Sequence, residues 1–173
     1  MTPLYAYDFD KTLVPYDSFR RYLKFLLRLR PVRVGALLVL RRIRLISSAN
    51  LKARVTRMVV QSAVLTHETK HFAQRLIYDV KMPQRATKGG VVLIISASPY
   101  IYMHLIADLL QCELLCSDSR DGQYIEMYGT TKADYLERLY PPQDYSYVYA
   151  ASDSESDLCW MKDFKQYDII DKQ

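Results

Sequence analysis

The sequence predicts an α/β fold in which a parallel sheet carries the functional residues and a long helical segment is inserted after the first strand. Apolar runs at residues 4–7, 91–95 and 147–151 have the length and composition of buried strands. Each run is followed closely by polar residues. Between the first two runs, apolar residues recur at three- and four-residue spacing, which is typical of helices.

Two carboxylates, Asp8 and Asp10, follow the first strand. Residues i and i+2 of an extended segment project to the same side, so both can face one ligand. Carboxylates crowded in a dry site stay ionised only if a cation lies between them or one holds a proton. Mg²⁺ fits this pair because it binds carboxylates together with phosphate oxygens. The alternative is a polar turn in which Asp10 merely caps a helix.

After the second strand comes the sequence Ser96-Ala97-Ser98-Pro99. We expect a loop here, followed by a helix that Ser98 caps and in whose first turn Pro99 lies. The Ser96 hydroxyl and the backbone amides would then lie at the sheet edge, where an anion can be held. An ordinary capped helix is the alternative.

Two later segments place charges at the start of a helix. Residues 129–136 predict a Thr-capped helix with Lys132 in its first turn. Cations are disfavoured there, so Lys132 either extends into water or pairs with a nearby anion. The turn after the third strand contains Asp153, Glu155 and Asp157. Acids suit a helix N-terminus, which is the simplest explanation of this cluster.

The order and spacing of these segments resemble the haloacid dehalogenase-like (HAD) superfamily, most closely its phosphoserine-phosphatase-like branch, subfamily IB. The matching residues are Asp8 and Asp10 (DxDxT), Ser96 (the Ser/Thr signature), Lys132 (the lysine signature), and Asp153 with Asp157 (DxxxD). The resemblance covers nearly the whole chain. It implies a Rossmann-like three-layer α/β/α core, residues 1–14 and 86–173, with an inserted helical cap of C1 type, residues 15–85.

The resemblance also implies a phosphatase that works through an aspartyl phosphate. Asp8 would be the nucleophile, and Asp10 would protonate the leaving alkoxide and then take a proton from water. The expected Mg²⁺ ligands are the Asp8 side chain, the Asp10 backbone carbonyl and Asp153, with Asp157 positioning the water ligands of the metal or Lys132. The groups expected to hold the phosphoryl oxygens are Ser96, the Ala97 amide and Lys132.

The segment expected to form the cap has several helix signals. Asp17 and Ser18 offer an N-cap for a first helix, residues 47–50 start a second, and Thr66 begins a third. Asp17 falls where phosphoserine phosphatases carry an acid that meets the amino group of the substrate. Arg54 is similar in position to the arginine that contacts the substrate carboxylate in those enzymes.

Charge is unevenly distributed along the chain. Residues 18–67 contain no acidic residue and 12 of the 24 Lys and Arg residues, whereas the remainder holds 12 basic and all 19 acidic residues, a net charge of −7. Such a basic face can steer an anionic substrate to the pocket. A solvated basic surface is the simplest alternative. Residues 22–45 are both apolar and cationic, which also suits peripheral contact with an anionic membrane. We expect no nucleic acid, because no base-stacking module accompanies the charge.

Two other patterns carry less weight. His67 and His71 fit the H-E-x-x-H zinc pattern, but zinc needs a third protein ligand and only His104 remains, so we expect an exposed polar helix face. Cys112, Cys116 and Cys159 form no CxxC pair. Their odd number suggests a reducing compartment, and the N-terminus has no charged-then-apolar leader. We therefore expect a cytoplasmic protein.

Three functions remain open from sequence. The leading one is a Mg²⁺-dependent phosphomonoesterase that acts on a small anionic metabolite. The others are a peripheral lipid phosphatase with a phosphatidylglycerophosphate-like substrate, and a non-catalytic phospholigand-binding protein. Transfer of the phosphoryl group to an alcohol instead of water also stays open. Past the DxxxD signature, where the family continues through another strand and helix, we expect only a helix near residues 158–164 and a strand near 167–171, which would leave a shortened core.

Overall fold

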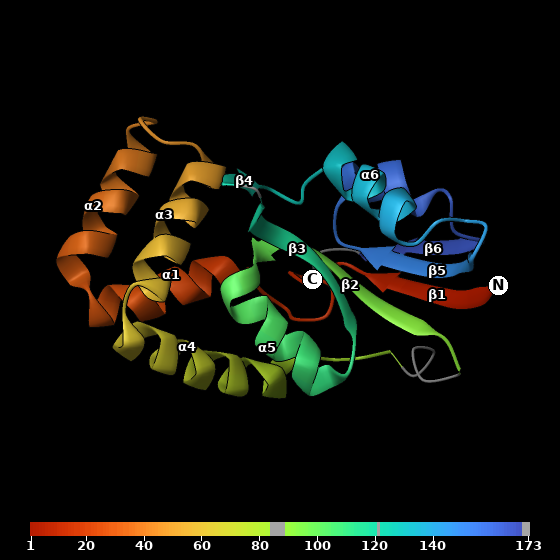
Figure 1. The fold of residues 1–173 in the computed structure, drawn as a ribbon, viewed down its shortest axis with the longest axis horizontal. Helices are drawn as coiled ribbons and strands as arrows, with labels where there is room; N and C mark the ends of the chain where they lie inside the picture. Colours follow the sequence, from red (N-terminus) through yellow and green to blue (C-terminus); the bar gives the residue numbers. More distant parts are fainter. Residues whose placement is uncertain (84–88, 121, 171–173) are drawn as a thin grey trace.

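The computed structural model of the chain describes residues 1–83, 89–120 and 122–170 (Figure 1). Within these residues a six-stranded sheet has the order β4-β3-β2-β1-β5-β6. All neighbouring strands are parallel except β3 and β4, which form an antiparallel pair. The strands are β1 (Thr2–Tyr7), β2 (Val91–Pro99), β3 (Glu113–Arg120), β4 (Gln123–Ile125), β5 (Tyr145–Ser152) and β6 (Gln166–Ile169).

Two apolar clusters, one on each side of the sheet, explain the layers. Leu4 and Ala6 of β1 belong to a cluster with Leu136 of α6 (Thr130–Leu139) and Trp160 of α7 (Leu158–Met161). Tyr7 of the same strand belongs to the other cluster, with α5 (Tyr100–Leu110) and the inserted helices. Because successive strand residues point to opposite faces, β1 is buried on both sides. The predicted three-layer α/β/α fold class is confirmed.

The inserted helices are α1 (Ser18–Leu29), α2 (Pro31–Arg42), α3 (Ser48–Val60) and α4 (Ala63–Leu76), followed by the short 3-10 helix η1 (Ile77–Asp79). They extend to one side of the sheet, and α4 lies beside α5 (Figure 1). Asp17 caps α1 and Ser47 caps α3, as predicted. The predicted start of the third helix at Thr66 is wrong, because Ser62 accepts a hydrogen bond from the Leu65 amide and starts α4 earlier. The expected boundary at residues 85 and 86 lies outside the described residues.

Three other sequence expectations need correction. Strand β2 continues to Pro99, and the N-cap of α5 is Pro99 rather than Ser98, whose hydroxyl donates to Asp10 instead. Helix α6 is not Thr-capped, because its N-cap is Gly129 with φ 56°. Glycine adopts this positive φ without the steric cost that a side chain brings.

The C-terminal elements are shorter than expected. Helix α7 ends at Met161 rather than near residue 164, and β6 ends at Ile169, while the expected strand limit at 171 lies outside the described residues. In the part of the chain that the structure covers, no helix combines the length and apolarity needed to cross a bilayer.

Candidate active site

The carboxyl ends of β1, β2 and β5 meet at one edge of the sheet. Tyr7 pairs with Ile94 on one side and with Ala151 on the other, and the Asp8 amide donates to the Ala151 carbonyl at 2.9 Å. The polar residues that follow each strand therefore start from neighbouring positions, at the edge where parallel α/β sheets bind ligands.

A buried ion-pair network occupies this edge. The Lys132 ammonium lies 2.8 Å from Asp8 Oδ1 and 2.7 Å from Asp157 Oδ2. Ser152 Oγ donates to the same Asp157 oxygen at 2.7 Å. Lys132 is only 3% exposed, so of the two sequence expectations it pairs with anions rather than extending into water. The first turn of α6 carries a cation because two carboxylates lie opposite it.

Burial and the mutual attraction of these groups shift the pKa values within the network. Burial raises the pKa of Asp8 to about 7, although Lys132 acts in the opposite direction. Burial lowers the pKa of Lys132, but Asp8 and Asp157 more than offset this, so the pKa lies above its usual value. Lys132 therefore stays protonated and can neutralise an anion brought close to Asp8.

Asp10 is held between β2 and the start of α1. Its Oδ1 accepts from the Ser18 amide at 2.5 Å and its Oδ2 from the Ser98 hydroxyl at 2.6 Å. The Ser18 hydroxyl lies 3.1 Å from Ser98 Oγ and 2.9 Å from the buried Tyr102 hydroxyl. Burial raises the pKa of Asp10 above the usual carboxyl value despite these bonds. A carboxyl with a raised pKa suits proton transfer, and Asp10 also contacts the first amide of α1.

Ser96 and Ala97 lie near the carboxyl end of β2, on the strand that also carries Ser98, the partner of Asp10. Ser96 is fully buried, and its Oγ accepts from the Ser98 amide at 3.1 Å. The Ala97 carbonyl accepts from Lys52 Nζ at 2.7 Å and from Ser117 Oγ at 2.8 Å. These two hydrogen bonds hold the backbone at Ala97 in place.

Sequence reasoning missed the role of Lys52. Besides Ala97, its ammonium bonds Glu126 Oε1 at 2.5 Å, and the Ser48 hydroxyl donates to the same oxygen at 3.0 Å. Lys52 is 6% exposed and connects α3 to the sheet edge. The available signal was its position: Lys52 lies three and seven residues before Val55 and Val59, so a cation shares the buried stripe of α3.

The residues expected to bind Mg²⁺ offer oxygen donors, the kind that a hard metal ion prefers. Asp153 is partly exposed, and its Oδ2 lies 3.8 Å from Lys11 Nζ. No group of three or more His, Cys, Asp or Glu side chains is arranged to hold a metal within the described residues. The expected set needs only two carboxylates, Asp8 and Asp153, with the Asp10 carbonyl. Mg²⁺ tolerates so few protein ligands because it keeps waters and binds substrate phosphate.

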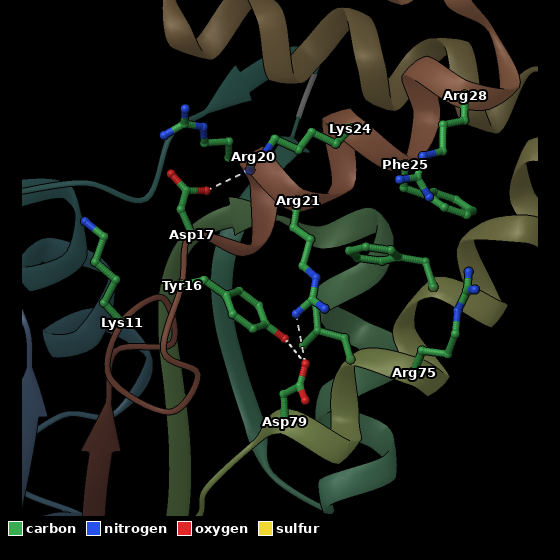
Figure 2. Close-up of a pocket in the computed structure, with 12 residues that line it drawn as sticks. Lys11, Tyr16, Asp17, Arg20, Arg21, Lys24, Phe25, Arg28, Arg75 and Asp79 are labelled. Carbon is green, nitrogen blue, oxygen red and sulfur yellow. Dashed lines mark hydrogen bonds and ion pairs between the residues drawn. The ribbon is translucent and has the colours of Figure 1, made fainter. Parts of the chain in front are cut away.

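The two expected substrate contacts are placed differently. Asp17 caps α1, accepting from the Arg20 amide at 2.8 Å, one residue before the Ser18 amide that binds Asp10. Arg54 is exposed on α3. A cavity of about 810 Å³ lies between α1 and α4, and Asp17 is one of the described residues that line it, whereas Arg54 is not (Figure 2).

The H-E-x-x-H histidines occupy one face of α4. The Nε2 atoms of His67 and His71 lie 3.0 Å apart, and both residues are exposed. His104 belongs to α5, where its Nδ1 lies 2.7 Å from the Tyr100 carbonyl oxygen. Cys112, Cys116 and Cys159 are free cysteines.

Comparisons with known proteins place this geometry in a family. The chain is similar to a protein of unknown function from Bordetella pertussis Tohama I, with TM-score 0.67, 17% identity and coverage of 96% of this chain and 89% of that one. A probable phosphoserine phosphatase from Vibrio cholerae gives TM-score 0.61 and 16% identity, covering 95% of this chain and 55% of its own. A phosphoserine phosphatase in apo form gives TM-score 0.51 and 14% identity, with coverage of 98% of this chain and 94% of that one.

These identities show a shared fold. No curated protein matches the chain. The family model for haloacid dehalogenase-like hydrolases matches residues 6–162, which include the end of β1, all of β2, all the inserted helices and the ion-pair network. The chain therefore belongs to the haloacid dehalogenase-like hydrolase family.

Proposed function

We propose that the protein is a Mg²⁺-dependent phosphomonoesterase that forms an aspartyl phosphate on Asp8 and acts on a small anionic phosphometabolite. The observation that carries this proposal is the Lys132 ammonium, 2.8 Å from Asp8 and buried with it. An anionic phosphoryl group can approach an anionic nucleophile only where such a cation offsets the repulsion. The structural likeness to phosphoserine phosphatases is consistent with this chemistry.

The residues suggest the following steps. The Asp8 carboxylate attacks phosphorus, and the bond to the substrate oxygen breaks as Asp10 gives that oxygen a proton. Asp10 then takes a proton from water, which attacks phosphorus and releases Asp8 and inorganic phosphate. Lys132, Ser96 and the Ala97 amide hold the phosphoryl oxygens. Mg²⁺ bound by Asp8, Asp153 and the Asp10 carbonyl would further reduce negative charge at the phosphoryl group.

The inserted helices would complete the site as a cap, residues 15–85, on a core formed by residues 1–14 and 86–173. The contacts of Asp10 with Ser18 and of Ala97 with Lys52 join these two parts beside the nucleophile. A small opening of the cap would admit substrate, and its closure would exclude water until hydrolysis. With this role the protein would act in the cytoplasm, where phosphometabolites are found.

Phosphate release tests the proposal. We expect a panel of phosphomonoesters, including phosphoserine, to yield at least one substrate with Mg²⁺ and none after chelation by EDTA. Asp8→Asn should lower kcat/KM at least about 10³-fold, because loss of a nucleophile removes the covalent route. Asp134→Asn, an exposed change on α6, is the matched control. Full activity of the Asp8→Asn variant, or turnover that is indifferent to EDTA, would contradict the proposal.

A second candidate, a peripheral lipid phosphatase, is favoured by α2. Val34 is the buried residue of this helix, whereas Val32 is 83% exposed and Leu45, just beyond the helix, is 69% exposed. Exposed arginines such as Arg41 lie among them. Apolar side chains between cations favour binding at an anionic bilayer surface. The protein should then sediment with phosphatidylglycerol vesicles and be released by high salt, and sedimentation should weaken in Val32→Ser. Indifference to vesicles at low salt would remove this candidate.

A further inference from the structure

The cavity between α1 and α4 is lined by more positive charge than its own acids can neutralise. Two acids, Asp17 and Asp79, line it together with six cations, which are Lys11, Arg20, Arg21, Lys24, Arg28 and Arg75. Figure 2 shows Lys11 near one end of this set and Arg28 and Arg75 near the other.

Both acids already have partners. Asp79 Oδ2 accepts from Arg21 at 2.9 Å and from the Tyr16 hydroxyl at 2.5 Å, and these bonds lower its pKa. The Asp17 carboxylate caps α1. The net charge of the cavity lining is therefore positive, with no acid left among the described lining residues to pair with the remaining cations.

Four of the cations have no acid to pair with. Across residues 1–83, 89–120 and 122–170, no carboxylate lies within 4 Å of the charged nitrogens of Arg20, Lys24, Arg28 or Arg75. Like charges gathered on one concave surface raise its potential and attract anions. The arginines also present the fork of donors that binds phosphate oxygens in pairs.

The wall between these cations is aromatic. The rings of Phe25 and Phe72 have centroids 5.4 Å apart, and the Arg75 guanidinium lies 5.5 Å from the Phe25 centroid. A ligand in this cavity would therefore place an apolar portion against the two rings and an anionic portion against the cations. Free phosphoserine, which is small and polar throughout, would leave most of the 810 Å³ unfilled.

One end of the cavity lies next to the proposed active site. Lys11 lies 3.8 Å from Asp153, and Asp17 precedes the residue whose amide binds Asp10. From there it follows α1 towards Arg28, a length of about 16 Å at the rise of an α-helix. One ligand could thus place a phosphoryl group at Asp8 and a second group near Arg28.

We propose that the substrate is a phosphomonoester with a second anionic group, a phosphate or phosphodiester, which Lys24, Arg28 and Arg75 bind at the far end of this cavity. This inference rests on the phosphatase function proposed above and specifies its substrate class. It assigns specificity to α1 and α4 rather than to Arg54 of α3. The second anion belongs either to a soluble metabolite or to a lipid headgroup.

Paired substrates test the inference. Decane-1,10-diol bisphosphate, whose extended chain matches the length of the cavity, and 10-hydroxydecyl phosphate differ only in the second phosphate. An acylated phosphodiester analogue in detergent micelles represents the lipid source. We expect kcat/KM about 10- to 100-fold higher for the bisphosphate, the range for charge-assisted hydrogen bonds, mainly through KM. A preference seen with the acylated compound alone would support the lipid source of the same anion.

Substitutions of the cavity arginines test whether the preference for the bisphosphate arises in this cavity. Arg28→Gln combined with Arg75→Gln should remove it while leaving kcat/KM for hydroxydecyl phosphate unchanged. The control is Arg57→Gln, an exposed arginine of α3 outside the cavity lining. If the double variant folds poorly, Arg28→Gln alone should reduce the preference. An unchanged preference in the folded variants would overturn the proposal.

Two measurements separate this inference from the proposed function. Equal kcat/KM for the two soluble substrates and no preference for the acylated phosphodiester, together with Asp8-dependent turnover, would overturn the inference alone. Absence of turnover on either substrate and on p-nitrophenyl phosphate would count against the phosphatase. Calorimetric binding to Asp8→Asn then still tests the cavity, because tighter binding of the bisphosphate than of hydroxydecyl phosphate supports it and equal binding refutes it.

Discussion

The sheet edge beside Asp8 and the cavity between α1 and α4 differ in whether their charged side chains have partners of opposite charge. At the edge, Lys132 is buried between two carboxylates and Lys52 is paired with Glu126. In the cavity, by contrast, Arg28 and Arg75 are exposed and have no acidic partner among the described residues. Paired buried charges are held in one arrangement, which suits the stabilisation of a transition state of fixed geometry. Unpaired exposed charges gain a partner only when a ligand arrives, so they suit selection between substrates.

This contrast predicts the largest loss of stability at Lys132. Lys132→Met leaves Asp8 and Asp157 buried without their shared cation, so the free energy of unfolding should fall by about 3–5 kcal/mol. Turnover should also fall by a factor on the order of 10³, the upper part of the range for losing one electrostatic donor. Urea unfolding and phosphate release measure the two effects.

A double variant separates the two roles of Lys132. Lys132→Met with Asp157→Asn removes one of the uncompensated charges, so stability should partly return while turnover stays low. Recovery of turnover in the double variant would mean that Lys132 serves folding rather than the phosphoryl group. Lys162→Met, an exposed change after α7, should alter neither measurement.

The meeting of Asp8, Asp10 and the later acidic turn at one sheet edge was predictable because its signals are local. Asp8 and Asp10 follow an apolar run directly, and Asp153 and Asp157 share one turn. Parallel strands then bring these short segments together without further information. Lys132 could be assigned an anionic partner because its place in the first turn of a helix is otherwise unfavourable.

The rest of the site depends on pairs far apart in sequence. Lys52 reaches Ala97, 45 residues away, and Glu126, 74 residues away, and no sequence motif connects Lys52 to either partner. The cavity arises where α1 packs against α4, so its lining follows from tertiary structure alone. The β3–β4 hairpin was also missed, because β3 carries Glu113, Ser117 and Asp118 rather than a continuous apolar run.

A smaller effect is expected at Lys52, which connects the two regions. Lys52→Met removes the bond that orients the Ala97 carbonyl, so kcat should fall about 10-fold, in keeping with the cost of a misplaced donor, while KM changes little. Ser48→Ala weakens only the Glu126 end of the network and should lower kcat less than about 2-fold. Steady-state kinetics on one substrate measures both. A change confined to KM would instead place Lys52 in direct contact with substrate.

The smallest effect is expected at Asp17, at the boundary between the edge and the cavity. Its carboxylate accepts from the Arg20 amide, so Asp17→Ala should lower the free energy of unfolding by about 1 kcal/mol, whereas Asp17→Asn keeps an N-cap and should cost only a few tenths. Ser47→Ala, at the N-cap of α3, is the matched control for a cap without a role at the site.

Thermal unfolding and kinetics together distinguish a helix cap from a substrate contact at Asp17. If Asp17 also binds an amino group of the substrate, Asp17→Asn should raise KM for amino-bearing substrates without a matching loss of stability. If KM is unchanged in Asp17→Asn, the residue acts only through α1, and selection between substrates depends on the unpaired cations farther along the helix.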